Sequence, residues 1–384
     1  MTAPYSFYIS TQIIYGKDSL QQLGDVARKL KVDKFQVITD PGVVGSGVLD
    51  QVLAQLNKAE IGSVVFDSVE VNPTVGTVDK AAGEYKAAGC NGVIALGGGS
   101  PLDAGKGVGV LATNPGGAAD YLGVDKVKQP SAPVIAIPTT AGTAAEITDV
   151  TVLSDPVKRA KLGLRSAYVA PRVALLDPLL TLGLPAVPTR DSGLDALTHA
   201  IESFICVNAW AASDALVLKA IELIGRYLRR AVYTGKDVEA RDGMLTASLL
   251  AGMAFHNTKL TLVHAITGPL GGAFNLPHGA INAIILPHAM EFMLPGAIDK
   301  YAQIAAALGE RVERLSKRAA AEKAVAAVKQ LSQDVGLPAG LACFGLSESD
   351  LTPLAQTIAG SFMVPLAPRV ASAEDVLAVC RASL

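Results

Sequence analysis

The hydrophobic positions of the first 185 residues fall into short continuous runs beside amphipathic stretches. The apolar runs lie at residues 34–39, 63–66, 92–96, 133–138, 147–155 and 172–178. The stretches with apolar residues three and four apart, the spacing of a helix with one buried face, include 18–30 and 77–89. Short apolar runs are typical of buried strands, and strands that alternate with helices form βαβ units. The pattern therefore predicts an α/β domain with a mostly parallel sheet.

The pattern changes after the proline-bracketed segment 184–188. Strand-like runs almost disappear, and long Ala- and Leu-rich stretches with helical spacing follow, for example at 213–232 and 298–331. The Ala-rich composition continues over 303–332, and we predict that this region is helical rather than disordered. The second half of the chain is therefore predicted to be all-helical.

The length and the charge of the chain narrow the possible classes of protein. The chain has 384 residues, half of them hydrophobic, which is more than one core of ordinary size accommodates. We therefore place an α/β domain at residues 1–185 and an all-helical domain at 186–384. The 33 basic and 35 acidic residues give a net charge of −2, and only 5% of the residues are aromatic. Neither a basic surface for nucleic acid nor a stacking platform for bases is indicated.

The sequence does not indicate a membrane or secreted protein. The mean hydropathy is positive, +0.37, yet each apolar run is far shorter than the roughly 20 residues that a bilayer span needs. The first ten residues show no charged segment followed by an apolar core, so no secretory signal is predicted. The four cysteines are scattered and form no CxxC pair, as expected of free thiols in a reducing compartment. We therefore expect a cytoplasmic protein without a membrane partner.

A glycine-rich segment follows the apolar run at 92–96. In GVIALGGGSPLDAGK, Gly97–Gly99 precede Ser100, a typical N-cap residue, and Pro101, which suits the first helical position. Glycines let the backbone approach a ligand closely, and a helix N-terminus presents free N–H groups to an anion. The segment therefore suits a diphosphate. A tight strand-to-helix turn is the alternative, and the Rossmann pattern GxGxxG is not met.

Two further segments carry polar side chains at the ends of predicted strands. Asp40 follows VIT, and a carboxylate there accepts hydrogen bonds from a ribose 2′-hydroxyl and repels a 2′-phosphate. Thr139, Thr140 and Thr143 follow VIAIP and offer hydroxyl groups. Because ligands of parallel sheets bind at the carboxyl ends of the strands, these segments favour the same site as the glycines. Both segments are equally suited to capping turns.

One of the five histidines, His199, lies four residues after Asp195. In a helix this spacing puts both side chains on one face, whereas the apolar residues of DALTHAIESF form another stripe. The pair would supply half of a metal site. Two alternatives stay open. Asp195 could complete a capping box with Ser192, or His199 could be an ordinary surface or core residue.

Two more histidines lie in the segment TLVHAITGPLGGAFNLPHG. His264 falls in an apolar helical run, where an unpaired imidazole is costly, and His278 lies at a predicted helix start. One carboxylate and three imidazoles suit Fe²⁺ or Zn²⁺, with a further position for water or a substrate oxygen. The four ligands would come from three helical segments.

Over nearly its whole length the chain resembles the iron-containing (group III) alcohol dehydrogenase family of the dehydroquinate synthase-like superfamily. The segments that carry the resemblance are IIYGKDSL, GGGSPLDAGK, PTTAGTAAEIT, LDALTHAIESF, LVHAITGPLGGAFNLPHGAINAIILPH and ASAEDVLAVCRASL. The resemblance implies an α/β N-terminal dinucleotide-binding domain with a mostly parallel sheet, and an all-α C-terminal metal-binding domain. It also implies NAD and Fe²⁺ as cofactors, with Zn²⁺ accepted by the same ligand types, and a homodimer.

The resemblance also assigns individual residues. The implied metal ligands are Asp195, His199, His264 and His278. The implied NAD contacts are Asp40, Gly97, Gly98, Ser100, Asp103, Thr139, Thr140, Thr143 and Lys161. Among these, Lys161 matches a lysine near the nicotinamide ribose, and Asp40 matches a position at which an acidic residue accompanies a preference for NAD.

The chain departs from the family near the third metal ligand. Members that reduce small aldehydes often carry a histidine four residues after that ligand, where this chain has Gly268, and smaller residues are common in place of His256 and Lys259. Lys259 would favour an anionic substrate, unless it is an ordinary surface lysine. His256 is a candidate for proton transfer, beside water and the ribose hydroxyls. The catalytic candidates are thus His278, His256 and Lys259.

The expected function is the NAD(H)-linked interconversion of a primary alcohol and an aldehyde by hydride transfer, with a metal ion as Lewis acid. The expected partner is therefore a small alcohol or aldehyde. One alternative is a reductase of an acid-bearing aldehyde such as a semialdehyde. A dehydroquinate synthase-like lyase is more remote, since few basic residues surround the metal motifs. A catalytically silent NAD-binding protein is disfavoured by the four intact ligand positions.

Overall fold

The computed structural model describes residues 5–158 and 160–384, which form two compact units. The α/β unit comprises residues 9–140 and 144–184, and the helical unit comprises residues 5–8, 141–143 and 185–384. The main change of unit falls between residues 184 and 185, one residue before the predicted boundary. Two short segments, residues 5–8 and 141–143, precede residue 185 in the sequence but belong to the helical unit. Their hydrophobic pattern does not predict this assignment.

The α/β unit contains a six-stranded sheet in which each hydrogen-bonded pair of strands is parallel. In their order across the sheet, the strands are β1 (Gln12–Tyr15), β9 (Val173–Leu176), β6 (Val134–Pro138), β4 (Gly92–Gly97), β2 (Lys34–Ile38) and β3 (Gly62–Phe66). The predicted parallel sheet is confirmed, and five of its strands coincide with apolar runs. The sixth, β1, was not predicted because it is four residues long, lies at the edge and is exposed at both ends.

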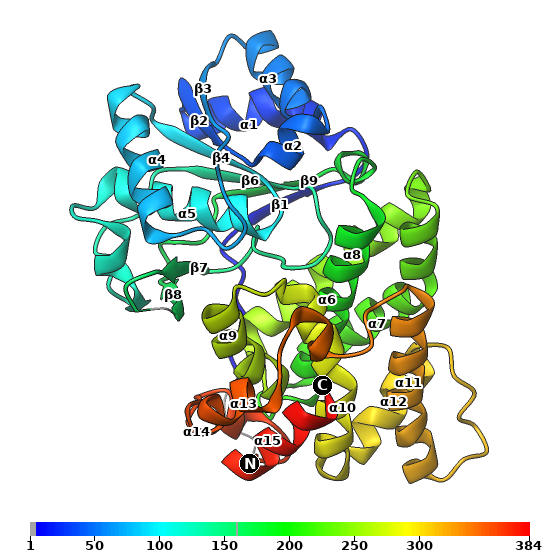
Figure 1. Cartoon of the computed structure of the whole chain (residues 1–384). Coiled ribbons are helices and arrows are strands. Elements are labelled where there is room, and N and C mark those ends of the chain that lie inside the picture. The colour runs from blue at the N-terminus through cyan, green and yellow to red at the C-terminus, as the bar shows by residue number, and fades with distance from the viewer. Residues whose placement is uncertain (1–4, 159) are drawn as a thin grey trace. The chain divides into compact units, whose positions relative to one another are not determined.

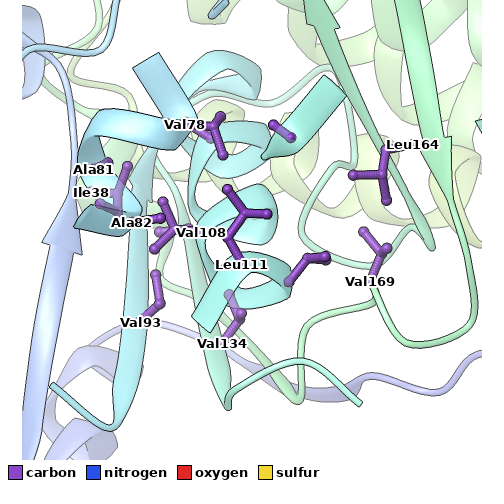
Figure 2. Close-up of a cluster of buried hydrophobic side chains, with 14 of the residues drawn as sticks. Ile38, Val78, Ala81, Ala82, Val93, Val108, Leu111, Val134, Leu164 and Val169 are labelled. Atoms are coloured by element: carbon purple, nitrogen blue, oxygen red, sulfur yellow. The ribbon is translucent and has the colours of Figure 1, made fainter. Parts of the chain in front are cut away.

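Helices cover both faces of this sheet (Figure 1). They are α1 (Leu23–Leu30), α2 (Pro41–Gly45), α3 (Val48–Lys58), α4 (Val75–Ala87) and α5 (Gly99–Thr113), with 3₁₀ turns at Ser19–Gln22, Ala118–Tyr121 and Pro178–Thr181. Alternate residues of a strand point to opposite faces. Val93 of β4 packs with α4 and α5, whereas Ile94 packs with α1, α2 and α3. Figure 2 shows the first of these clusters, with Val108 and Leu111 of α5 among side chains of the strands.

A second, three-stranded sheet belongs to the same unit. Its strands, in order, are β5 (Gly123–Val124), β8 (Ala160–Arg165) and β7 (Val150–Asp155). β7 and β8 are antiparallel, whereas β5 and β8 are parallel. The predicted run at 147–155 therefore forms a strand outside the main sheet.

The helical unit consists of helices joined by turns and loops, with an extended loop between α11 and α12 (Figure 1). Its α-helices are α6 (Ala186–Ile205), α7 (Ala211–Tyr233), α8 (Val238–Thr258), α9 (Leu262–Phe274), α10 (His278–Met293), α11 (Ile298–Ala307), α12 (Lys317–Asp334), α13 (Glu348–Leu351), α14 (Ala355–Ala359) and α15 (Ala373–Ala382). Its 3₁₀ turns are Leu294–Gly296, Leu341–Phe344, Thr352–Leu354 and Val364–Leu366. Over residues 5–158 and 160–384, no helix combines the length and the hydropathy that a bilayer crossing requires.

The predicted helical region 303–332 is helical at both ends but is interrupted at one place. α11 ends at Ala307 and α12 begins only at Lys317. Gly309 between them has a φ of +93°, a left-handed conformation that ends helices. The hydroxyl of Ser316 accepts a hydrogen bond from the backbone N–H of Ala319 and caps the start of α12. A glycine followed by an N-cap serine was the signal in the sequence, and the Ala-rich composition obscured it.

Candidate functional site

A carboxylate and an imidazole lie one turn apart near the middle of α6. Asp195 and His199 are both buried, and Asp195 Oδ2 lies 3.9 Å from His199 Nδ1. The two side chains share one side of the helix, as their spacing predicted. α6 begins at Ala186, so Asp195 lies too deep in the helix to form a capping box with Ser192. The hydroxyl of Ser192 donates instead to the carbonyl oxygen of Thr189, and that alternative is excluded.

Two further imidazoles approach the same carboxylate from other helices. His264 lies in the first turn of α9, and His278 is the first residue of α10. The rings of His199 and His264 stack with their centroids 4.8 Å apart, and those of His264 and His278 meet edge to face at 5.3 Å. His278 Nε2 lies 4.0 Å from Asp195 Oδ1. The structure thus brings all four predicted metal ligands together, and donor atoms of the three buried ones lie within 4.8 Å of one another.

The side-chain amide of Asn282 lies among these donor atoms. Asn282 follows His278 by one turn of α10 and is fully buried. Its Nδ2 lies 2.7 Å from Asp195 Oδ1 and 3.1 Å from Nε2 of both His264 and His278. An amide group has two hydrogens but here meets three acceptors, and its Oδ1 has no hydrogen-bond partner in the described part of the chain. The three acceptor atoms therefore converge on a point that a cation satisfies better than an amide does.

A second carboxylate, Glu202, lies beside the outer nitrogen of His264. Glu202 follows His199 by three residues on α6 and has no exposed surface. Its Oε1 accepts hydrogen bonds from the backbone N–H of Thr261 at 3.2 Å, the hydroxyl of Thr261 at 2.7 Å and the backbone N–H of Val263 at 2.7 Å. Its Oε2 is hydrogen-bonded to His264 Nδ1. Glu202 therefore satisfies N–H groups at the start of α9 and also holds the histidine of that helix.

These contacts indicate which nitrogen of each buried ring carries the hydrogen. His199 Nδ1 lies 3.2 Å from the carbonyl oxygen of Gly142, and a carbonyl only accepts, so this nitrogen carries a hydrogen. His264 Nδ1 faces the Glu202 carboxylate, which likewise accepts. In each neutral ring the lone pair then lies on Nε2. Metal-binding histidines are usually held in this way, with the second nitrogen donating to a carbonyl or a carboxylate.

Burial and neighbouring charges act in opposite directions on the pKa values of the site. Burial raises the pKa of Asp195, but the three imidazoles outweigh it and the pKa is lowered. Burial lowers the pKa of His199 despite the opposing charge of Asp195. Burial also lowers the pKa of His264, but the Glu202 carboxylate outweighs burial and the pKa is raised. An ionised Asp195 and a neutral His199 are the forms that bind metals, and the charge of Glu202 makes His264 a more basic ligand.

The donor set fits a divalent cation. One carboxylate and three imidazoles with convergent donor atoms are ligands that Fe²⁺ and Zn²⁺ accept. Two carboxylates, those of Asp195 and Glu202, are buried here, and a buried anion requires a compensating charge nearby. A divalent cation supplies that charge. The side chain of His278 is 39% exposed, so solvent and small molecules reach the site from the side of this ligand.

The remaining catalytic candidates lie at the end of α8. His256 is buried, and Lys259 follows the helix in a left-handed conformation with a φ of 75°. The Lys259 ammonium donates to the carbonyl oxygen of His256 at 2.6 Å. A cation at this position stabilises the negative end of the helix, which favours a capping role for the lysine. At Gly268 on α9, an added Cβ would meet no atom within 4 Å, so this position has room for a larger side chain.

In the α/β unit, the glycine run joins β4 to α5. Gly97 has a φ of +144°, and a Cβ on it would lie 3.3 Å from Asp40 Oδ2. A Cβ on Gly98 would lie 3.2 Å from Thr140 Cγ2. The backbone N–H of Thr139 donates to the carbonyl oxygen of Gly97 at 3.0 Å. Since β2 and β6 flank β4 in the sheet, the polar segments after these strands lie beside the glycines, as predicted.

The helix after the glycines begins earlier than predicted. α5 starts at Gly99, and its N-cap is Gly98 in an extended conformation. The prediction of Ser100 as N-cap and Pro101 as first helical residue is therefore wrong, because glycines without Cβ atoms let the helical turn begin within the run. The hydroxyl of Ser100 instead accepts from the backbone N–H of Asn72 at 3.2 Å. The first N–H groups of α5, which have no partner within the helix, thus belong to the glycine run itself.

The other predicted cofactor residues are more dispersed. Asp103 Oδ1 lies 2.8 Å from Lys106 Nζ, and its Oδ2 accepts from the backbone N–H of Val152, so this carboxylate connects α5 to β7. Lys161 lies on β8, where burial lowers its pKa to about 8. Thr143 belongs to the helical unit. The predicted residues that the structure gathers at the glycine run are Asp40, Gly97, Gly98, Ser100, Thr139 and Thr140.

Two residues of the metal site, Glu202 and Asn282, were not predicted from the sequence. Each lies in an apolar part of a helix, three or four residues after a predicted ligand, which is the spacing of neighbours on one helix face. Asn282 follows His278 by four residues, just as His199 follows Asp195 by four residues. The spacing was therefore a usable signal, but only once the ligands themselves were known.

Comparisons with known proteins cover both units. Residues 10–178 match the iron-containing alcohol dehydrogenase family, and residues 189–384 match the C-terminal domain of the Fe-containing alcohol dehydrogenase family. The chain is 37% identical to 1,3-propanediol dehydrogenase from Klebsiella pneumoniae over 98% of each chain. It is 34% identical to NAD-dependent methanol dehydrogenase from Bacillus methanolicus, over 99% of this chain and 100% of the other. A crystal structure of 1,3-propanediol oxidoreductase matches with a TM-score of 0.96 at 37% identity, covering 100% of both chains.

Proposed function

The chain belongs to the iron-containing alcohol dehydrogenase family and is an oxidoreductase that interconverts alcohols and aldehydes with NAD; we propose that it acts on small neutral primary alcohols through the site on α6, α9 and α10. The observation that carries the proposal is the convergence of one carboxylate and three imidazoles on a single point. We assign the metal ligands as Asp195, His199, His264 and His278.

Fe²⁺ is the ion that we propose for this site, and Zn²⁺ uses the same donor types. When bound, the ion supplies a Lewis acid that polarises a carbonyl oxygen. The protein residues set the conditions for this chemistry. Asn282 donates to Asp195 and orients its carboxylate, while the carbonyl oxygen of Gly142 orients the ring of His199. The exposed side chain of His278 leaves the site open to a small substrate.

The α/β unit is proposed to bind NAD(H), which supplies or accepts the hydride. The N–H groups at the start of α5 suit the diphosphate, because Gly97 and Gly98 leave the backbone accessible. Asp40 suits the ribose 2′-hydroxyl and disfavours a 2′-phosphate. The other proposed contacts are Ser100, Asp103, Thr139, Thr140, Thr143 and Lys161.

The proton that accompanies the hydride requires its own carrier. We propose water for this role, because Gly268, one turn after His264, leaves open space around the position of its missing Cβ. His256, which is buried at the end of α8, and the ribose hydroxyls stay as alternatives.

Neutral substrates are favoured over acid-bearing ones by two observations. The relatives from Klebsiella pneumoniae and Bacillus methanolicus are named for 1,3-propanediol and methanol, which are small and uncharged. Lys259, the cation that would attract an anionic aldehyde, is engaged with the carbonyl oxygen of His256. The lyase alternative is not favoured either, since both units match alcohol dehydrogenases.

The test is NADH oxidation by Fe²⁺-reconstituted enzyme across an aldehyde panel, with Lys259→Ala beside the wild type. Propanal and lactaldehyde represent neutral substrates, and succinic semialdehyde represents an anionic one. We expect the neutral aldehydes to have the higher kcat/KM, with the preference unchanged in the variant. A preference for succinic semialdehyde that Lys259→Ala removes would contradict the proposal and make Lys259 a specificity residue.

The homodimer that the family resemblance implies and the cytoplasmic location expected from the sequence both stay predictions. Sedimentation of the purified chain tests the first of them, with twice the mass of 39.5 kDa as the expected result.

A further inference from the structure

Glu202 is a fully buried carboxylate that is neither one of the four proposed metal ligands nor one of the proposed NAD contacts. We propose that Glu202 is a positioning residue for the metal site: it fixes the tautomer and the orientation of His264, and it joins this ligand to the start of α9. The proposal rests on the proposed function, because it concerns a residue that acts on a metal ligand rather than on the substrate.

Over residues 5–158 and 160–384, the hydrogen-bond partners of Glu202 Oε1 are all donors. Oε1 accepts from the backbone and hydroxyl of Thr261 and from the backbone of Val263, and Oε2 pairs with His264 Nδ1. All of these partner groups belong to residues 261–264, at the start of α9, and Glu202 reaches them from α6, about 60 positions earlier in the chain. One carboxylate therefore fixes both the first turn of α9 and the ring that projects from it.

Helix capping alone does not explain a buried charge at this position. Thr261 is the N-cap residue of α9, and threonine is a good N-cap, yet its side chain makes no cap hydrogen bond within the helix. Its hydroxyl donates to Glu202 instead. A buried carboxylate is costly unless it does more than a neutral group could. The additional contact is the one to His264 Nδ1, which leaves the lone pair of the ring on Nε2, the atom that faces Asp195 and His278 through Asn282.

The substitution Glu202→Gln separates the two roles. Three donors face Oε1, so a glutamine must keep its carbonyl oxygen there and place its NH₂ group against His264 Nδ1. That NH₂ group is a donor, and Nδ1 must then accept. The hydrogen of the neutral ring moves to Nε2, where it blocks the lone pair needed by a metal. The capping hydrogen bonds of α9 stay intact in this variant, and only the polarity of the contact to His264 is reversed.

Thr261→Val is the matched control. Valine has nearly the shape of threonine but removes the hydroxyl that donates to Glu202 Oε1. The carboxylate keeps its two backbone donors and its contact to His264. This variant perturbs the same buried cluster while leaving the tautomer of His264 unchanged.

The experiment measures Co²⁺ and Zn²⁺ affinity of the full chain by competition with a chelator, together with the visible absorption spectrum of the Co²⁺ form. For Glu202→Gln we expect affinity to fall 10- to 100-fold, the usual effect of losing such a partner, with an altered spectrum. For Thr261→Val we expect affinity within about threefold of the wild type and an unchanged spectrum. Equal affinity and spectrum in Glu202→Gln and the wild type, or equal losses in both variants, would overturn the proposal.

A measurement on the wild type covers the case in which Glu202→Gln does not fold. In Zn²⁺-loaded protein labelled with ¹⁵N-histidine, the His264 ring is expected to show its hydrogen on Nδ1, and a hydrogen on Nε2 would overturn the proposal. The wild-type arm also separates this inference from the proposed function. A wild-type chain that retains no metal contradicts the proposed function itself. Metal affinity that is the same in Glu202→Gln and the wild type contradicts only this inference.

Discussion

The proposed metal site of the helical unit consists of side chains, three of them buried, whereas the glycine run of the α/β unit consists of backbone. At the first site, Asp195, His199 and His264 each have a second polar partner that fixes their orientation. At the glycine run, Gly97 and Gly98 matter because they have no side chain that would crowd the neighbouring atoms. The two sites should therefore fail in opposite ways: the first when a side chain is removed, and the second when a single methyl group is added.

The largest effect is expected from removing a metal ligand. His199→Ala or Asp195→Ala should eliminate stoichiometric metal and reduce turnover by at least about 10³-fold, since the Lewis acid contributes several kcal/mol to the barrier. NADH binding should persist, because the α/β unit has its own core. Metal analysis and NADH fluorescence check both statements. His288→Ala is the control, a histidine paired with Glu291 outside the site. Full metal and full rate in either ligand variant would show the assignment to be wrong.

The second effect is the loss of cofactor affinity on adding one methyl group to the glycine run. In Gly97→Ala the Cβ would lie 2.7 Å from Pro101 Cγ on a residue with a φ of +144°. Strain of about 1–3 kcal/mol is expected, equivalent to about 10- to 100-fold weaker NADH binding. Metal content should be unchanged. NADH titration checks the prediction against Gly83→Ala, where the added Cβ of a helical glycine meets no atom within 4 Å. Equal NADH affinity in the two variants would argue against a cofactor role for the run.

The third effect concerns the choice between NADH and NADPH. Asp40 caps α2 by accepting from the backbone N–H of Val43 at 3.0 Å, and asparagine is an equally good cap. Asp40→Asn therefore removes the charge while keeping the helix start. We expect the preference for NADH over NADPH, measured as a ratio of kcat/KM values, to fall about tenfold, or ~1.4 kcal/mol. An unchanged ratio of the two kcat/KM values would show that Asp40 only caps α2 and does not select the cofactor.

The smallest effect is a dependence of cofactor binding on pH. Burial lowers the pKa of Lys161 from 10.5 to about 8. Its positive charge is therefore present at pH 7 and is lost as the pH rises through about 8. If Lys161 contacts the cofactor as proposed, losing this partly screened cation should weaken NADH binding about two- to fivefold between pH 7 and pH 9. Lys161→Met should bind NADH with the weaker affinity at both pH values, and a wild-type profile in that variant would contradict the assignment.

The same lysine also affects stability, with the opposite sign. Between the folded pKa of about 8 and the ordinary value of 10.5, the unfolded chain binds more protons at this position than the folded chain does. The contribution of Lys161 to the free energy of unfolding therefore increases with pH over this window. Denaturation at pH 8 and pH 10, with Lys161→Met as the reference, measures it.

Much of the α/β unit could be predicted because its strands are short apolar runs. Such runs are buried on both faces, as Ile94 and Val93 illustrate in the two clusters on either side of β4. The start of α5 could not be placed correctly, since Gly98 and Gly99 allow conformations that a serine-first cap does not. The break at Gly309 was missed because alanine-rich composition resembles a helix whether or not the helix is continuous.

The metal site shows where the spacing of residues stops being informative. The pair Asp195 and His199 could be predicted from one turn of one helix. The approach of His264 and His278 depends on how three helices pack. The sequence named these two residues as candidates, and the family resemblance then assigned them as ligands. Glu202 could not be predicted from the sequence, because a carboxylate on a helix is usually exposed. Its role becomes visible only from its contacts with the start of α9.

The most direct test of the central claim is a crystal structure of the Co²⁺-loaded chain, with anomalous scattering used to locate the ion. The expected result is one ion bonded to an oxygen of Asp195 and to Nε2 of His199, His264 and His278, with Glu202 still on Nδ1 of its histidine. An ion bound elsewhere, or bound through Nδ1 of either buried ring, would contradict the account of how this site is built.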